Sequence, residues 1–354
     1  MKTLEQCRVI ALQTPYAHGD PLAGGVLRQY AEDYVVNEMP LLEPDGEGEH
    51  VWLKIRKRHT NTDFVAKQLQ KLAKVKSMAV SYAGMKDRHA VTTQWFSVLL
   101  PTTDEPDWQS LASDEIDIIE VKRHSRKLRR GTLLGNHFII QVRDIDVDND
   151  ALLERAQKIT KQGVPNFFAN QRFGHNAANL DKALAMFEGD RRIKRHQRSI
   201  YLSSARSLLF NYILAERVRV GSWCSLQPGD ICLRTGRRGF FPVETLDTEL
   251  QERLDAGEIH PTAPMWGVGE LPVKYEIKEL EQQLPIEFPD WCTGLEKAGL
   301  KMERRECRLV PDAFFVEKND DGVKLSFSLP AGCYATSVIR ELFDARDYDR
   351  FSKT

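Results

Sequence analysis

The amino-acid sequence predicts an α+β protein with two domains, and three observations support this fold class. The chain has 354 residues, about twice the ~150 residues of one ordinary domain. Over roughly the first 190 residues, short β-branched and aromatic runs alternate with segments of helical periodicity. After about Asp190 the pattern changes: glycine turns become frequent, residues 241–300 carry an acidic excess, and the earlier style returns near Val323. This order predicts a core domain interrupted by an inserted one.

The first predicted strands are Tyr34–Val36 and Val51–Ile55, because both runs are short, apolar and rich in β-branched or aromatic residues. An acidic loop of turn-forming residues, Glu43 to Glu49, separates them. A helix is expected to begin near Thr62, whose hydroxyl can cap it. The apolar residues that follow recur at helical spacing: Phe64, Val65, Leu69 and Leu72.

The later elements follow from the same two periodicities. After a short segment at Ser81–Gly84, we expect strands at Trp95–Leu100, Ile116–Val121 and Phe138–Val142. Helices are expected at Asp150–Gln162, Leu180–Phe187 and Ser203–Val218. Beyond the acidic segment, a strand at Val323–Leu329 and a helix at Thr336–Phe343 complete the pattern.

Composition excludes several classes of protein. Hydrophobic residues make up 42% of the chain and charged residues 29%, which is typical of folded domains and not of disordered ones. No stretch reaches the ~18 apolar residues of a membrane helix, and Glu5, Gln6 and Arg8 interrupt any apolar core of a secretory signal. The six cysteines form no CxxC pair, which argues against a zinc ribbon or a disulfide scaffold. We therefore expect a soluble cytoplasmic protein.

Charge is segregated along the chain although the net charge is only −1. Residues 51–90 hold ten Lys and Arg against two acids, and residues 121–143 hold seven cations and no acid. Residues 241–300 hold thirteen acids and four cations. Basic surfaces bind polyanions because phosphate contacts release counterions. The alternative is that these runs are solvated helix faces, but several basic runs between strands favour a nucleic acid, and RNA in particular.

Motifs of metal and cofactor enzymes are absent from the sequence. There is no GxxxxGK[ST] loop, no HExxH, no strand-borne GxGxxG and no GxSxG, and the nine histidines are dispersed. We therefore expect no metal and no cofactor. Catalysis would then depend on a carboxylate or an amine that acts on a bound polymer.

Asp87 is the strongest candidate for such a group. It lies in a predicted loop between two strands, in the segment from Tyr82 to Trp95, with Lys86 and Arg88 beside it. Nearby cations favour the ionised form of a carboxylate, which can then act as a nucleophile or a base. The alternative is a turn aspartate that hydrogen-bonds to its own backbone.

Three further segments suggest RNA contacts. Val164 to Gly174 combines three aromatic residues with asparagine and arginine, a mixture suited to stacking on a base and reading its edge, or simply to a core. Lys122 to Arg130 holds six cations in nine residues, and Arg191 to Arg198 is a second basic run. Such cations position phosphates without reading sequence, or form a solvated loop.

Together these segments resemble the TruD family of tRNA pseudouridine synthases. The most specific stretch is AG-x-KD-x-HA-x-T at Ala83–Thr92. The other matching motifs are Glu32–Glu38, Pro44–His50, Asn61–Ala66, Lys127–Gly131, Val164–Gly174, Ala205–Asn211 and Leu329–Ser337. The resemblance extends from about Gly25 to the last predicted helix.

The resemblance implies a fold and an activity. It implies a pseudouridine synthase core, a mixed and largely antiparallel sheet with flanking helices, formed by residues 1–191 and 309–354. An α/β TRUD domain would be inserted at 192–308. The implied reaction is isomerisation of a uridine in tRNA, at position 13, to pseudouridine without a cofactor. The implied partner is tRNA; no obligate protein partner is evident and we expect a monomer.

The resemblance also implies site residues. Asp87 matches the catalytic aspartate, and Asn166 and Phe168 match an asparagine and an aromatic that line the uridine pocket. Arg28 stands where the family often has lysine, which keeps the charge but changes the donor geometry. The cations expected on the RNA backbone are Lys86, Arg88, Arg123, Arg126, Lys127, Arg129, Arg130 and Arg172.

The mechanism and two rival functions stay open at this point. The target base must be extruded before a carboxylate can reach it, and Asp87 could then attack C6 of uracil or C1′ of ribose. The sequence does not identify the base that removes the C5 proton. One rival function is a tRNA-binding or remodelling protein without catalysis, and the other is a metal-dependent nuclease.

Overall fold

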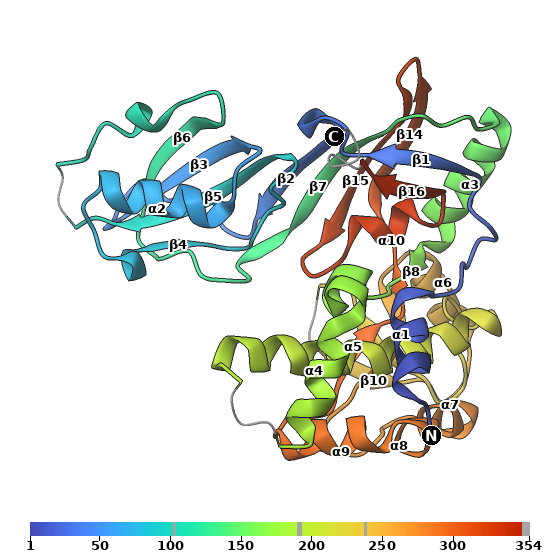
Figure 1. The fold of residues 1–354 in the computed structure, drawn as a ribbon. Coiled ribbons are helices and arrows are strands. Elements are labelled where there is room, and N and C mark those ends of the chain that lie inside the picture. Colours follow the sequence, from blue (N-terminus) through green and yellow to red (C-terminus); the bar gives the residue numbers. More distant parts are fainter. Residues whose placement is uncertain (102–103, 190–192, 237–238, 349–354) are drawn as a thin grey trace. The chain divides into compact units, whose positions relative to one another are not determined.

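The computed structural model describes residues 1–101, 104–189, 193–236 and 239–348 (Figure 1). The chain divides into two compact units. The sheet unit comprises Leu22–Ala156, Pro311–Gly332 and the residues from Leu342 onward. The helical unit comprises Met1–Pro21, Gln157–Val310 and Cys333–Glu341. No helix among the described residues is both long and apolar enough to cross a bilayer.

The sheet unit is built on an eight-stranded sheet with the order β14-β15-β7-β2-β5-β3-β6, in which β4 also pairs with β5. Its strands are β2 (Tyr34–Pro40), β3 (His50–Arg58), β4 (Val80–Tyr82), β5 (Val91–Leu99), β6 (Ile116–His124), β7 (Leu133–Val142), β14 (Asp312–Asn319) and β15 (Gly322–Pro330). Only β2 and β5 pair in parallel. The described part of the chain therefore confirms the predicted mixed and largely antiparallel sheet. A separate parallel pair joins β1 (Ala23–Leu27) to β16 (Phe343–Asp347).

One face of this sheet is covered by α2 (Thr62–Leu72). Alternate residues of β3, namely Val51, Leu53 and Ile55, are fully buried and pack with Val65 and Leu69 of the helix. The inward-facing residues of β3, which alternate along the strand, and the apolar face of α2 thus form one core. The helix was predicted at nearly these bounds.

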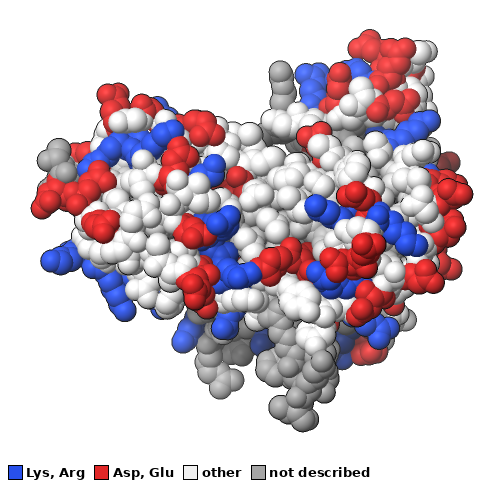
Figure 2. Space-filling model, turned by 90° about the horizontal axis from the view of Figure 1, so that it is seen from above, with Lys and Arg blue, Asp and Glu red and all other residues white. Residues whose placement is uncertain are grey.

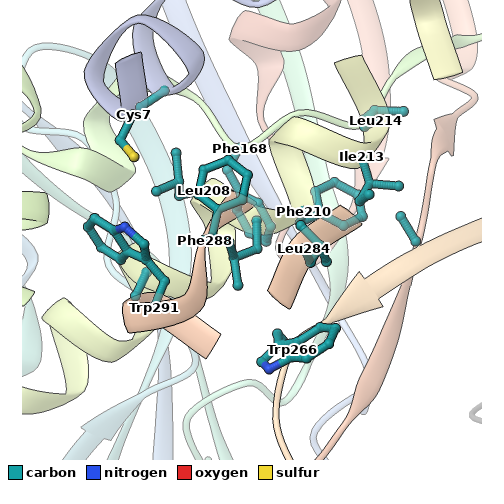
Figure 3. Close-up of a cluster of buried hydrophobic side chains, with 14 of the residues drawn as sticks. Cys7, Phe168, Leu208, Phe210, Ile213, Leu214, Trp266, Leu284, Phe288 and Trp291 are labelled. Atoms are coloured by element: carbon teal, nitrogen blue, oxygen red, sulfur yellow. The ribbon is translucent and has the colours of Figure 1, made fainter. Parts of the chain in front are cut away.

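The helical unit packs around α5 (Arg195–Arg219), which is longer than the predicted helix. The other helices of this unit are α1 (Leu4–Leu12), α4 (Ala178–Phe187), α6 (Thr248–Asp255), α7 (Tyr275–Glu281), α8 (Gln283–Glu287), α9 (Pro289–Lys297) and α10 (Ala335–Ile339). Helix α3 (Asn149–Gln162) begins in the sheet unit and ends in the helical unit. Figure 3 shows the unit's apolar core, with Phe168, Leu208 and Phe210 among the labelled side chains.

Short strands complete the helical unit. A four-stranded sheet has the order β10-β9-β11-β12, and a two-stranded one joins β13 to β8. Their bounds are β8 (Val164–Pro165), β9 (Ile231–Arg234), β10 (Phe240–Pro242), β11 (Ile259–Met265), β12 (Glu303–Glu306) and β13 (Arg308–Leu309). The four-stranded sheet lies within residues 231–306, where the sequence shows glycine turns and, at 241–300, an acidic excess, and where we expected no strand.

The predicted domain boundaries differ from the boundaries of the two units. The boundary at 308/309 lies inside the helical unit, between the two residues of β13. The boundary at 191/192 lies outside the described residues. An inserted domain at 192–308 therefore stays a prediction.

Two local predictions were wrong. The helix expected at Thr336–Phe343 ends at Ile339, and Phe343 begins β16, where it pairs with Ala23. Thr62 is the first helical residue and not the cap. Its hydroxyl instead donates to Gln94 at 3.1 Å and accepts from the backbone N–H of Lys86 at 3.0 Å. The hydroxyl of Thr62 thus makes tertiary hydrogen bonds in place of the predicted helix-capping bond.

Acid is expected to destabilise the helical unit through His260 on β11. Burial, together with the charge of Arg308, lowers its pKa to about 4, so the folded state keeps His260 neutral while the unfolded chain binds a proton near pH 6.5. Stability from this group is present above pH 6.5 and is lost as the pH falls from 6.5 towards 4, by about 2 kcal/mol between pH 7.5 and 5. Urea unfolding at these two pH values measures it. His260→Gln should lose less stability than wild type, whereas the exposed control His175→Gln should behave as wild type; equal losses in all three would contradict the assignment.

Candidate active site

Asp87 lies in the loop between β4 and β5, as predicted. Its side chain is 49% exposed, and its Oδ2 lies 3.7 Å from Nη2 of Arg28. The carboxylate is therefore open to solvent on one side and faces a guanidinium on the other. This arrangement suits a nucleophile that must reach a ligand from outside.

Arg28 follows β1 and adopts a left-handed backbone conformation with φ of 57°. Its side chain is 10% exposed and donates to Asp347 of β16 at 2.5 Å. Its guanidinium carbon lies 3.9 Å from the ring centre of Tyr34. Burial alone would lower the pKa of Arg28, but Tyr34, Asp347 and Asp87 raise it above its ordinary value. Arg28 thus stays charged beside Asp87.

Tyr34 is buried below Arg28, on β2. Burial raises its pKa, against the opposing effect of the Arg28 charge, so its phenol is neutral at physiological pH. Its ring also contacts Phe138 of β7 edge to face, with centroids 6.4 Å apart. Tyr34, with Phe138 packed against its ring, therefore lies beneath the guanidinium that faces Asp87.

The backbone of the Asp87 loop is held at several points. Nζ of Lys57 donates to the carbonyl of Asp87 at 2.8 Å, and Nε2 of Gln94 donates to the carbonyl of Gly84 at 2.9 Å. Thr62 accepts from the N–H of Lys86, as described above. Such bonds fix the path of the loop, while the side chain of Asp87 stays half-exposed and can meet a ligand.

Strand register places one row of side chains on the sheet face that bears this loop. Lys57, Thr92, Val36 and Phe138 are neighbours across β3, β5, β2 and β7. Asn136 lies two residues from Phe138 and therefore on the same face. Oγ1 of Thr92 and Oδ1 of Asn136 are buried, and neither has a hydrogen-bond partner among the described residues. Buried polar atoms normally have partners, so these two are unsatisfied polar atoms on the sheet face that bears the loop.

The basic run of residues 122–130 ends in the loop between β6 and β7, which packs against the segment leading to Asp87. The N–H of Gly131 donates to the carbonyl of Ala83 at 2.8 Å, and Oγ of Ser81 donates to the carbonyl of Leu128 at 2.7 Å. Four predicted phosphate ligands on this loop are exposed: Arg126, Lys127, Arg129 and Arg130. The predicted basic loop and the predicted nucleophile thus belong to one local structure.

Not every predicted phosphate ligand points outward. Lys86 is 5% exposed and bound to Glu38 at 2.5 Å, and Arg123 donates to Glu105 at 2.6 Å and to the carbonyl of Leu100 at 2.8 Å. In the helical unit, Arg172 donates to Ser203 at 3.0 Å and to the hydroxyl of Tyr334 at 2.5 Å. In these three residues the charged groups bind other parts of the protein, so their contacts indicate a structural role and not phosphate binding. Arg88 is exposed, with Nε 3.3 Å from the carbonyl of His59.

Asn166 and Phe168 belong to the helical unit, where both are buried. The amide of Asn166 accepts from Arg305 at 2.6 Å and donates to the carbonyl of Glu306 at 3.0 Å. Phe168 is 6% exposed and packs edge to face on Phe210 within the core drawn in Figure 3. These contacts are those of core residues. A pocket shared with Asp87 stays a prediction, since Asp87 belongs to the other unit.

The segregation of charge in the sequence is less evident on the folded surface. Figure 2 shows one face, on which Lys and Arg side chains are interspersed with Asp and Glu. Many basic residues of the sequence runs are paired with acids far along the chain, as Arg56 is with Asp117. The basic surface of the site therefore depends on the exposed loop cations and not on the whole runs.

Several residues around Asp87 were not predicted from sequence: Tyr34, Lys57, Asn136 and Asp347. Lys57 was counted only within a basic run, and Tyr34 only within a strand. Asp347 joins Arg28 across 319 positions, and no local pattern reports such a contact. Asn136 lies outside the predicted strand Phe138–Val142, because β7 begins earlier, at Leu133.

Comparisons with known proteins agree with the fold and the motifs. The sequence model of tRNA pseudouridine synthase D (TruD) matches residues 13–190 and 177–342. Proteins named tRNA pseudouridine synthase D from Aeromonas hydrophila and Methylococcus capsulatus are each 46% identical, over 95% and 93% of this chain and 96% and 94% of theirs. A crystal structure from Methanosarcina mazei that carries the same name superposes with a TM-score of 0.73 over 97% of this chain and 98% of that one, at 23% identity, and so shares the fold. The chain therefore belongs to the TruD family of tRNA pseudouridine synthases.

Proposed function

We propose that the chain isomerises uridine 13 of tRNA to pseudouridine, with Asp87 as the nucleophile. The observation that carries the proposal is the geometry of Asp87: a half-exposed carboxylate, on a loop whose backbone is held by Lys57, Thr62 and Gln94, beside the charged Arg28. Pre-organised groups of this kind are what covalent catalysis requires.

The reaction balances without a cofactor. The C1′–N1 bond of the nucleoside breaks and a C1′–C5 bond forms, while the C5 proton leaves and N1 takes up a proton. Asp87 adds either to C6 of the ring or to C1′ of the ribose, and is released when the new bond is complete. The cation of Arg28 stabilises negative charge, first on the carboxylate and then on the detached ring.

The extruded base needs a partly apolar pocket with a few polar contacts. In the sheet unit, the half-exposed carboxylate of Asp87 and the charged Arg28 beside it support a uracil site. The expected contribution of Asn166 and Phe168 from the helical unit remains part of the proposal, as do a monomeric state and a cytoplasmic location.

Mapping pseudouridine in bulk tRNA tests the proposal directly. Cells that lack this protein should carry uridine at position 13 of the target tRNAs, and re-expression should restore pseudouridine there. Unchanged pseudouridine in the deletion strain would contradict the proposed target. Turnover by the purified protein in excess chelator, without strand scission, would exclude the nuclease.

The exposed loop cations are expected to bind the tRNA backbone. Replacing Arg126 and Lys127 together by Ala should make the plot of log affinity against log salt shallower by about 1 to 2, since each lost phosphate contact removes a slope of ~0.7 to 0.9. Filter binding between 50 and 200 mM salt measures this slope. The matched double variant Lys278→Ala with Lys297→Ala, in the acidic segment, should keep the wild-type slope. An unchanged slope in the loop variant would make the loop a solvated surface.

A further inference from the structure

Lys57 has an unusual position for a residue of a basic run. It lies near the end of β3, and its side chain is fully buried. Its Nζ donates to the carbonyl of Asp87 and to the carbonyl of Thr60, both at 2.8 Å. A lysine that the sequence assigns to a polyanion-binding surface therefore lies beneath the candidate nucleophile.

Burying an ammonium group is costly, and the two acceptors of this one are neutral carbonyl groups. Burial lowers the pKa of Lys57 to about 8, although the nearby charge of Asp87 raises it and that of Lys86 lowers it further. Removing this donor would leave the carbonyls of Asp87 and Thr60 without it, which costs free energy when the acceptors are buried. The ammonium thus restrains the backbone at both carbonyls, one of which belongs to Asp87.

The strand that carries Lys57 is well suited to position another residue. β3 is hydrogen-bonded on both sides, to β5 and to β6, and Lys57 faces Thr92 and Ile116 in their register. A charge-assisted hydrogen bond from this strand is about twice as strong as a neutral one. It connects a central strand directly to the backbone of Asp87.

We propose that Lys57 is a positioning residue for the pseudouridine synthase reaction, whose buried ammonium fixes the main chain of Asp87 so that the carboxylate meets the extruded nucleoside. The inference rests on the proposed function of Asp87. Lys57 touches neither the substrate nor the reacting atoms, so its loss should affect the rate of the bound complex and not the affinity for tRNA.

The test compares Lys57→Met, which keeps the length of the side chain and removes the charge and the donors, with wild type. Single-turnover pseudouridine formation at saturating protein should fall about 30- to 100-fold, because a displacement of ~1 Å at a catalytic group costs about 100-fold. The tRNA Kd should stay within twofold. The control Lys324→Met, an exposed lysine on β15 of the same sheet, should match wild type in both measurements.

Lys57→Arg tests whether a cation is what the position requires. Its guanidinium remains charged, although it is bulkier and its donors have a different geometry, so it should recover part of the lost rate. Should Lys57→Met fail to fold, Lys57→Gln, which keeps a neutral donor, is judged by the same rate and Kd criteria.

Three results would overturn the inference: a rate within threefold of wild type in a folded Lys57→Met or Lys57→Gln protein, a loss explained entirely by weaker tRNA binding, or no recovery in Lys57→Arg. A wild-type protein that forms no pseudouridine would instead overturn the proposed function. An active wild type with an equally active Lys57→Met variant would leave that function intact and refute only the role of Lys57.

Discussion

Replacing Asp87 by Asn is expected to abolish pseudouridine formation, with the rate falling at least about 10⁴-fold, the order of loss seen when a nucleophile is removed. The amide has nearly the same shape as the carboxylate but cannot add to C6 or C1′. The half-exposed side chain lies 3.7 Å from Arg28, which keeps its closer partner Asp347, so the fold and the tRNA Kd should change little. Single-turnover assays with pseudouridine mapping, together with filter binding, measure the two effects.

The control for this change is Asp320→Asn, which removes one exposed negative charge from the β14–β15 turn of the same unit. It should leave the rate unaltered. If Asp87→Asn still forms pseudouridine at a comparable rate, the assignment of the nucleophile is wrong. If the wild type binds tRNA and modifies nothing, the remodelling function becomes the better explanation.

The largest effect on stability is expected from Arg217 on α5. Its fully buried guanidinium donates to both carboxylate oxygens of Asp230, at 2.6 and 2.9 Å, and to the carbonyl of Ser222. Burial alone would lower the pKa of Arg217, but Asp230 raises it above its ordinary value. Arg217→Met leaves the carboxylate buried without its partner, so unfolding should become easier by about 3 to 5 kcal/mol. The urea midpoint measures this loss.

Two further variants isolate the cause of that loss. Arg219→Met, two residues along the same helix, breaks an exposed pair with Glu216 and should cost less than about 1 kcal/mol. The double variant Arg217→Met with Asp230→Leu removes both charges and should recover most of the stability. A double variant as unstable as Arg217→Met would show that lost packing, and not an unpaired charge, is responsible.

Local patterns in the sequence predicted the strongly periodic elements well. Helix α2 and the strand that contains Val51–Ile55 were found because apolar spacing alone determines which face is buried. The helix predicted through Phe343 was wrong because the end of that segment is determined by pairing with β1, more than 300 residues away in sequence. Long-range pairing of this kind has no local signature.

The same distinction applies to the site. Asp87 and the loop cations could be proposed from the sequence because they lie in short and continuous stretches, and Arg28 from its position in the resemblance; their roles stay predictions. The sequence could not show whether a basic side chain is buried or exposed. Lys57 and Lys86 are buried, whereas Arg126 and Lys127 are exposed, although all four are basic residues of the same kind of run. Burial depends on the strand register and on the ion pairs, which form only when the sheet does.

The pairing of β1 with β16 has a consequence for synthesis of the protein. At a translation rate of about 5 to 20 residues per second, a growing polypeptide contains Arg28 for roughly 15 to 60 seconds before its partner Asp347 is made. During that time the ribosome-bound chain cannot close the parallel pair, and Asp87, the proposed nucleophile, lacks a guanidinium that Asp347 holds in place. On the proposed function, the ability to modify tRNA is therefore acquired late, when β16 emerges and joins β1.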